Sequence, residues 1–153
     1  MIGRLRTIAA LAALAVAAAV AGLALPPLDR DEARFAQASA QMIESGDYIR
    51  ITFQDEARNK KPAGIYWLQA AAVQTFSSPE ARAIWAYRLP SVLGLVIAVI
   101  ATYGAGCLIV GRRAAFAGAG LLAVTVLAGA EAGIAKTDAM LMGVTAVAMA
   151  ALA

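Results

Sequence analysis

The chain of 153 residues contains no histidine and only one cysteine, Cys107. Without histidine, the sequence lacks the usual general base of enzymes and the commonest zinc ligand. A single cysteine allows no disulfide within the chain and no cysteine-based metal site. Because Cys107 lies in an apolar run, we interpret it as a small core residue.

Charged residues are scarce and unevenly distributed. They make up 15% of the chain, against about 25% in soluble domains. The net charge of +3 comes from 13 Lys and Arg against 10 Asp and Glu, which is a small excess. The sequence has no basic run with interleaved aromatic residues, the pattern that indicates a nucleic-acid-binding protein. The sequence also has no Gly-rich phosphate loop, no internal repeat and no sustained heptad pattern.

Hydrophobic residues dominate the composition instead. They reach 61% of the chain, and the mean hydropathy is +0.72, whereas soluble domains are about 45–50% apolar. This predicts an all-α integral membrane protein. We expect one transmembrane domain with spans at residues 7–25, 89–110, 114–130 and 139–153. The last span is shorter than the roughly 20 residues needed to cross a bilayer, so we expect this chain to be the N-terminal portion of a longer protein.

Basic residues predict the orientation of these spans. Arg4 and Arg6 precede the first apolar run, which places the N-terminus in the cytoplasm, and Arg112 and Arg113 place the turn after the second span on the same side. A cleaved signal peptide ending near residues 22–24 is the alternative for the first run. The h-region of a signal peptide is usually about 7–15 residues long, and this run is longer, which favours an uncleaved anchor.

Residues 26–88 are polar enough to form an outer loop, and we expect three short helices in it. The first covers residues 31–45, with Asp29 as its N-cap, Glu32 completing a capping box, and Gly46 as its end. The second, 62–76, is expected to lie on the membrane, with Tyr66 and Trp67 at the level of the headgroups. The third covers 79–87, and residues 47–54 between the first two are expected to be extended.

Polar residues at the edges of the predicted spans are the candidate functional groups. A carboxylate at a helix N-terminus, such as Asp31, suits a general base or a cation ligand, although helix capping alone is the alternative. Glu32 is adjacent and does not share a helical face with Asp31, so the two have different roles. Lys61 suits a lipid phosphate, or is simply a solvated lysine. Asp138 either caps the fourth span or belongs to the same site.

Four short motifs, in this order, carry a resemblance to a known family. They are Asp-Glu-Ala-Arg-Phe at 31–35, Met-Ile-Glu-Ser-Gly-Asp-Tyr-Ile at 42–49, Asn-Lys-Lys-Pro-Ala-Gly-Ile-Tyr-Trp-Leu at 59–68 and Thr-Asp-Ala-Met-Leu at 137–141. The chain from about residue 28 to 141 resembles the start of the membrane glycosyltransferases that include aminoarabinose transferases (ArnT) and protein O-mannosyltransferases. This resemblance implies the GT-C fold, with an extracytoplasmic loop of juxtamembrane helices.

The resemblance implies a transferase that moves a sugar from a polyprenyl-phosphate donor to a lipid, glycan or protein acceptor. The reaction would occur on the periplasmic face of a bacterial inner membrane, as in lipid A or protein glycosylation of the cell envelope. The matched positions imply catalytic roles for Asp31 and Asp138. They imply substrate-binding roles for Glu32, Arg34, Lys61 and Tyr66.

Two positions depart from the family pattern. Aminoarabinose transferases typically have a glutamate metal ligand where this chain has Lys60, and a tyrosine is common where it has Phe35. We therefore assign no metal ligand and no certain cofactor, and leave a divalent metal open. These departures favour a general member of the family over a true aminoarabinose transferase.

A non-catalytic polytopic membrane protein, such as a transporter fragment or an assembly subunit, is the alternative function. Transporters place ionisable residues near the bilayer midplane. The acidic residues of this chain are expected at the outer edge of the membrane, which favours the transferase.

Overall fold

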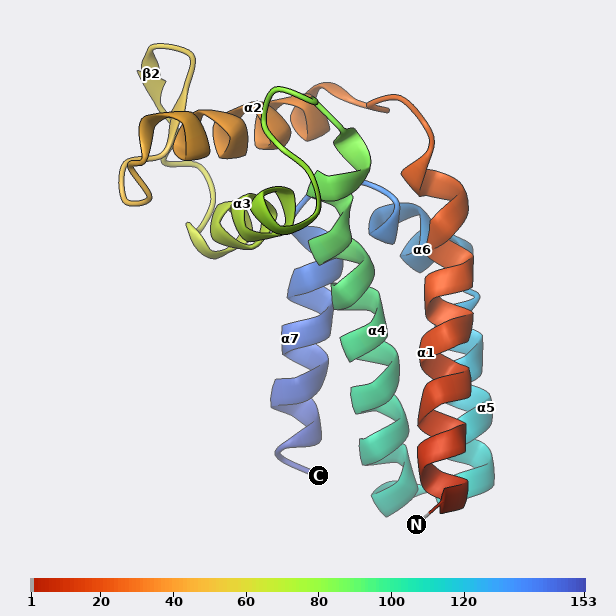
Figure 1. Cartoon of the computed structure of the whole chain (residues 1–153). Coiled ribbons are helices and arrows are strands. Elements are labelled where there is room, and N and C mark those ends of the chain that lie inside the picture. The colour runs from red at the N-terminus through yellow and green to blue at the C-terminus, as the bar shows by residue number, and fades with distance from the viewer. Residues whose placement is uncertain (1) are drawn as a thin grey trace.

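The computed structural model describes residues 2–153, and this part of the chain is almost entirely helical (Figure 1). Within it, the only strands are β1 (Thr52–Phe53) and β2 (Glu56–Ala57), which pair antiparallel as a small hairpin. The prediction of an all-helical protein is confirmed in this part of the chain. The helices are α1 (Ile2–Leu23), α2 (Arg30–Ser45), α3 (Gly64–Phe76), α4 (Ile84–Ile109), α5 (Arg112–Ala123), α6 (Val126–Ala132) and α7 (Asp138–Ala150).

Helix α4 is the centre of the structure. It packs against α1, α3, α5, α6 and α7, while α2 and α3 lie across the end of the bundle opposite to both chain termini (Figure 1). Small residues allow the close packing: Ala15 and Ala19 of α1 and Ala119 of α5 are fully buried with Leu95 and Val99 of α4. The bundle thus presents two distinct ends, and the outer loop covers one of them.

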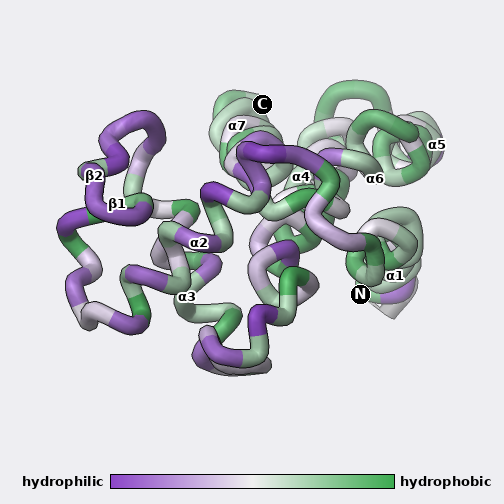
Figure 2. Tube along the Cα trace, turned by 90° about the horizontal axis from the view of Figure 1, so that it is seen from above, coloured by the Kyte–Doolittle hydropathy of each residue, from purple (hydrophilic) through white to green (hydrophobic). Residues whose placement is uncertain are grey.

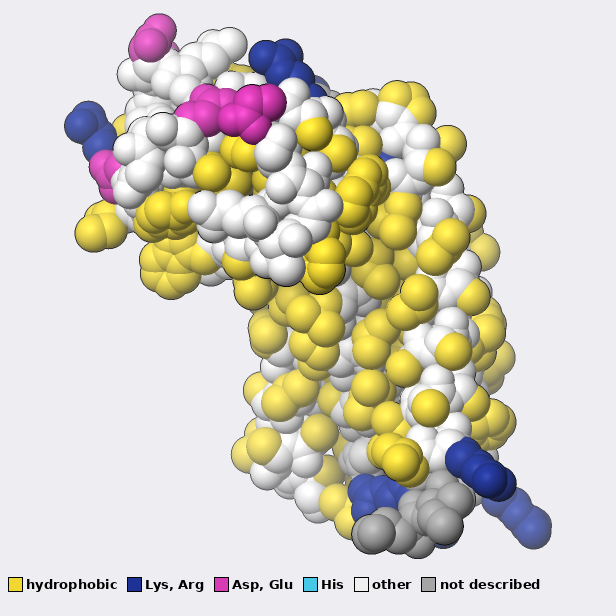
Figure 3. Space-filling model, in the orientation of Figure 1, with side chains coloured by type: hydrophobic (Ala, Val, Ile, Leu, Met, Phe, Trp, Pro, Cys, Tyr) yellow, Lys and Arg dark blue, Asp and Glu magenta, His cyan; other side chains and the backbone are white. Residues whose placement is uncertain are grey.

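Two helices are long and apolar enough to cross a membrane, Gly3–Leu23 and Ile84–Ile109. The pair α5 and α6 qualifies as a third span if the two are taken together, and α7 is apolar but has only 13 residues. On the face seen in Figure 3, Lys and Arg side chains gather at the two ends, and hydrophobic side chains cover the middle. The protein therefore has the composition and helix lengths of a membrane-associated protein.

The outer loop contains two of the three predicted helices. Helix α2 begins after Asp29, whose side chain accepts a hydrogen bond from the N–H of Glu32, and it ends at Gly46, whose φ of 69° is left-handed. Helix α3 corresponds to the predicted helix 62–76, but it begins two residues later, at Gly64. Of the predicted extended stretch 47–54, only Thr52–Phe53 forms a strand. Seen from above, the hydrophilic residues concentrate over α2 and the hairpin (Figure 2).

The predicted third loop helix, 79–87, is wrong. Residues 79–82 form turns, and α4 runs without interruption from Ile84 to Ile109, so it begins five residues before the predicted span at 89. The predicted loop ended at Arg88, and an unpaired charged residue is costly inside a membrane-spanning helix. In the structure Arg88 is fully buried and paired, which removes that obstacle.

The predicted third span, 114–130, corresponds to two helices with a break between them. Helices α5 and α6 meet at a bend of 58°. Thr125 has an extended ψ of 122°, and its Oγ1 donates to the carbonyl of Leu121 at 2.8 Å. A hydroxyl that bonds the preceding turn competes with the regular helical pattern and favours a bend. The bend carries α6 toward the end of α1, with which it packs.

Candidate functional site

Glu32, in the first turn of α2, lies at the meeting point of four segments. Its side chain is fully buried. Oε1 accepts from Nε of Arg88 at 2.7 Å and from the backbone N–H of Ala135 at 2.9 Å. Oε2 accepts from the N–H of Leu28 at 2.8 Å and from Nη2 of Arg88 at 3.0 Å. One carboxylate therefore joins the start of α2 to α4 and to the turn between α6 and α7.

Arg88 extends this network to the end of α1. Its Nη1 donates to the carbonyls of Gly22 at 2.7 Å and Leu25 at 2.6 Å, and Nη2 donates to Pro26 at 3.1 Å. Helix C-termini leave carbonyls without partners inside the helix, so a guanidinium with five donors can satisfy several at once. We call Glu32 and Arg88 the central ion pair.

The electrostatics of Glu32 match this geometry. Burial is the largest single influence on its carboxyl and raises the pKa, because it disfavours the charged form. The hydrogen bonds from Arg88, Ala135 and Leu28, with the positive charge of Arg88, outweigh burial, so the pKa of Glu32 is lowered. The carboxylate is thus ionised in the folded protein at neutral pH.

A second ion pair, between Asp29 and Lys136, lies beside the central one. It joins the N-cap of α2 to the turn before α7, and both side chains are partly exposed. The hydrogen bond from Lys136 is the main cause that lowers the pKa of Asp29, and the same bond raises the pKa of Lys136. The two pairs together hold the turn 133–137 against the start of α2.

The predicted catalytic residues Asp31 and Asp138 lie at the same end of the bundle. Asp31 is exposed over 59% of its side chain, and Arg34 donates to it at 3.3 Å. Asp138 is exposed at the first position of α7. Glu32 accepts a hydrogen bond from the N–H of Ala135, and this bond brings the start of α2 next to the turn before α7. Charged residues of these two segments therefore lie on the same end of the bundle. We use the name rim for four charged residues at this end, the exposed Asp31 and Asp138 and the partly exposed Arg34 and Lys136.

Among the predicted substrate-binding residues, Glu32 and Tyr66 are the two that are buried. A carboxylate has about four lone-pair sites, and all four of Glu32 are used, so a contact with substrate would need this network to open. Tyr66 is fully buried, stacks on Phe35 with ring centroids 5.3 Å apart, and its hydroxyl accepts from Nε of Arg58 at 2.8 Å. Tyr66 therefore packs inside the protein and does not face the headgroups, whereas Trp67 is half exposed.

Arg34 and Lys61 are the predicted substrate-binding residues that remain accessible. The guanidinium of Arg34 lies 5.9 Å from the ring centre of Phe53, and that of Arg58 lies at the same distance from this ring. Lys61 is exposed three residues after Arg58, in the turn that leads to α3. Within residues 2–153 Lys61 forms no ion pair with the rim, and only its place in the chain brings it near Arg58.

Sequence reasoning missed the roles of Arg88 and Arg58. Both lie in the predicted outer loop 26–88, where neither was given a partner. The sequence does contain a signal for Arg88. An arginine next to a long apolar run needs an acidic partner, and Glu32, at the start of an amphipathic helix, was a candidate for that partner. Nothing in the local sequence around Arg58 pointed to the hydroxyl of Tyr66.

Neither a metal centre nor a related protein was found. Within the described range, no three His, Cys, Asp or Glu side chains are grouped so that they could hold a metal ion. Comparisons of the chain with protein-family models, curated proteins and solved structures found no match. The chemical interpretation of the rim therefore depends on its geometry and on the sequence motifs.

Proposed function

We propose that this chain forms part of a membrane glycosyltransferase that moves a sugar from a polyprenyl-phosphate donor to an acceptor at the membrane surface. The observation that carries the proposal is the rim itself. Two exposed carboxylates, Asp31 and Asp138, and two cations, Arg34 and Lys136, lie at one end of an apolar helix bundle. A lipid-borne phosphosugar has groups that match these. Its apolar tail suits the apolar helices, its phosphate suits the cations, and its hydroxyls suit the carboxylates.

The proposed reaction is a direct displacement at the anomeric carbon. The bond between that carbon and the phosphate oxygen breaks, and the acceptor oxygen forms the new bond. The leaving phosphate gains negative charge, which Arg34 and Lys61 would stabilise. A hydroxyl acceptor would lose its proton to Asp31. If the acceptor is itself a phosphate, no base is needed and Asp31 would orient the reacting groups.

An apolar groove on the same end of the molecule supports a lipid-linked donor. It has a volume of about 410 Å³ and lies between α3 and the first turns of α4. Phe76 and Trp85, both exposed, line it together with Leu68 and Leu93. A polyprenyl chain entering along this groove would bring its phosphate to the level of the outer loop.

The test is a transfer assay with membranes that contain the complete protein. A polyprenyl phosphate carrying a radiolabelled hexose serves as donor, and label in the delipidated acceptor fraction is measured. Asp31→Asn and Lys61→Ala should each lower transfer by at least about 100-fold, the usual contribution of a general base or of an electrostatic contact to the transition state. The amount of protein in the membrane should stay normal.

Two matched controls accompany these variants. Lys60→Ala removes the neighbouring exposed cation, and Asp55→Asn removes an exposed carboxylate in the hairpin turn. Both should keep normal transfer. Unchanged transfer in Asp31→Asn and Lys61→Ala would refute the proposal.

A further inference from the structure

The end of the bundle opposite to the rim carries positive charge without any acidic residue. Arg4 and Arg6 begin α1, and Arg112 and Arg113 begin α5. The sequence has no Asp or Glu in residues 1–28, 81–130 or 139–153, which include all the segments that reach this end. Within residues 2–153, the four arginines therefore place positive side-chain charge beside apolar helices.

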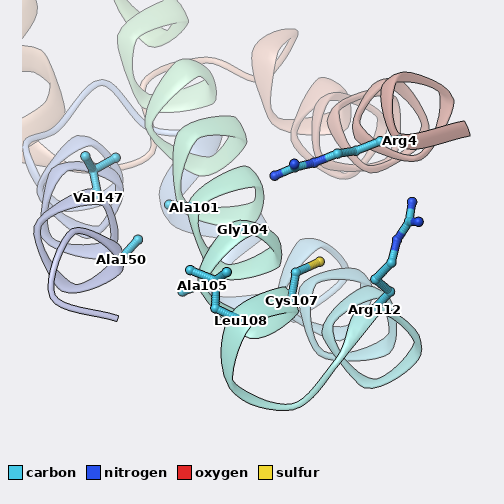
Figure 4. A pocket seen from close by; sticks show the side chains of 9 residues that line it. All are labelled: Arg4, Ala101, Gly104, Ala105, Cys107, Leu108, Arg112, Val147 and Ala150. Carbon is cyan, nitrogen blue, oxygen red and sulfur yellow. The ribbon is translucent and has the colours of Figure 1, made fainter. Parts of the chain in front are cut away.

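A cavity of about 590 Å³ lies at this end, among α1, α4, α5 and α7. Pockets for small ligands have volumes of about 300–1,000 Å³. Figure 4 shows Arg4 extending from α1 toward α4, and Arg112 rising from the start of α5 toward α1, and both line this cavity together with Cys107. The two guanidinium groups thus face one cavity from two different helices.

The other walls of the cavity are apolar and made of small side chains. Ala101, Gly104 and Ala105 of α4 face Val147 and Ala150 of α7. A Cβ placed on Gly104 would meet no atom within 4 Å, so there is open space along this wall. An inorganic anion would leave the wall without contacts, whereas an acyl chain fits it.

We propose that this cavity binds an anionic phospholipid, with Arg4 and Arg112 holding the headgroup phosphate and one acyl chain lying along α4 and α7. Basic pockets between membrane helices are suited to anionic lipid headgroups. The choice of a lipid over a free anion follows from the apolar wall, and the choice of an anionic lipid follows from the absence of acidic residues. This site is independent of the proposed transferase.

The test is native mass spectrometry of the detergent-solubilised chain during titration with phosphatidylglycerol. We expect one tightly bound lipid per chain and weaker binding of phosphatidylcholine of the same chain length. The double variant Arg4→Gln, Arg112→Gln should weaken the binding of phosphatidylglycerol by about 100-fold, since the loss of each charge-assisted contact with the phosphate costs about tenfold. The bound lipid should also slow the reaction of Cys107, which lines the cavity, with a maleimide.

Two further variants separate the cavity from a general charge effect. Arg6→Gln, Arg113→Gln removes the same charge from the same end without changing the cavity lining, so it should leave binding nearly unchanged. Gly104→Leu keeps every charge but fills the apolar wall, so it should weaken binding. Circular dichroism and thermal unfolding confirm that each variant is folded.

Three results would overturn the proposal. Equal losses in the two arginine double variants would show attraction to surface charge alone, and unchanged binding in Gly104→Leu would place the lipid elsewhere. Displacement of the lipid by inorganic phosphate or glycerol phosphate at equal concentration would show that a free anion suffices.

Discussion

A charged side chain inside an apolar bundle must be matched by other polar groups, and Arg88 is matched by Glu32 and by carbonyls at the end of α1. Breaking a buried ion pair by removing one partner leaves the other charge uncompensated, which costs about 3–5 kcal/mol. The central ion pair holds α1, α2, α4 and the turn before α7 in one arrangement. Asp31 and Asp138 depend on it for their common position, although neither touches Arg88.

Substituting Glu32 tests this directly. Glu32→Gln keeps the size of the side chain but removes its charge, so unfolding should become easier by about 3–5 kcal/mol, measured as a large drop of the melting temperature in detergent. Glu44→Gln, an exposed change on the same helix, should have almost no effect. The losses from Glu32→Gln and Arg88→Met should be strongly non-additive, and a double variant whose loss equals the sum of the two single losses would contradict the central ion pair.

The lowered pKa of Glu32 predicts a loss of stability in acid. Its carboxyl has an ordinary pKa of 4.5 and a lower one in the folded protein, so its contribution is complete above about pH 4.5. The contribution disappears as the pH falls through the folded value, because protonation then favours the unfolded chain. Between pH 6 and pH 3 the wild-type melting temperature should fall more steeply than that of Glu32→Gln. Parallel curves would rule out this contribution.

Among the elements, α4 and α7 approach each other through glycine. A Cβ on Gly94 would overlap the backbone of Ala139 and Met140, and one on Gly143 would overlap the carbonyl of Gly94. Small residues allow close approach of membrane helices where lipid gives no hydrophobic drive. The same contact places the start of α7, and so Asp138, beside α4.

Gly94→Ala should therefore destabilise the protein. The added methyl group must push α7 away from α4, and overpacking of this kind costs about 1–3 kcal/mol. Gly104→Ala, on the same helix but in open space, should be neutral or slightly stabilising. Thermal unfolding of the two variants in one detergent decides the matter, and equal melting temperatures would argue against close contact at Gly94.

The elements that sequence reasoning identified are those with local signals. Asp29 and Gly46 are the cap and the end of α2 because their side-chain and backbone preferences act within a few residues. The bend at Thr125 and the extension of α4 past Arg88 depend on partners that periodicity does not reveal. The burial of Tyr66 likewise required knowledge of where α2 lies relative to α3. Long-range pairing was therefore the part that could not be predicted.

For the whole molecule, the two ends of the bundle differ in what they carry. One end has the outer loop, the rim and every acidic residue of the chain, and the other has four arginines and no acidic residue. Basic residues near spans favour the cytoplasmic side, so we predict that the rim faces outward.

Labelling with a membrane-impermeant maleimide checks this orientation. In a Cys107→Ala background, a cysteine introduced by Ser45→Cys should react from outside in intact cells, because residue 45 ends α2 in the outer loop. One introduced by Arg113→Cys should react only after the membrane is opened. The reverse pattern would place the rim in the cytoplasm.

The central claim is that the rim end holds a lipid-borne phosphate. The most direct measurement is the affinity of the chain, in phosphatidylcholine nanodiscs, for a polyprenyl phosphate. Lys61→Ala and Arg34→Gln should each weaken this binding by about tenfold or more, as expected for loss of a charge-assisted contact, while Lys60→Ala and Arg113→Gln leave it unchanged. Equal binding by all four variants and the wild type would contradict the claim.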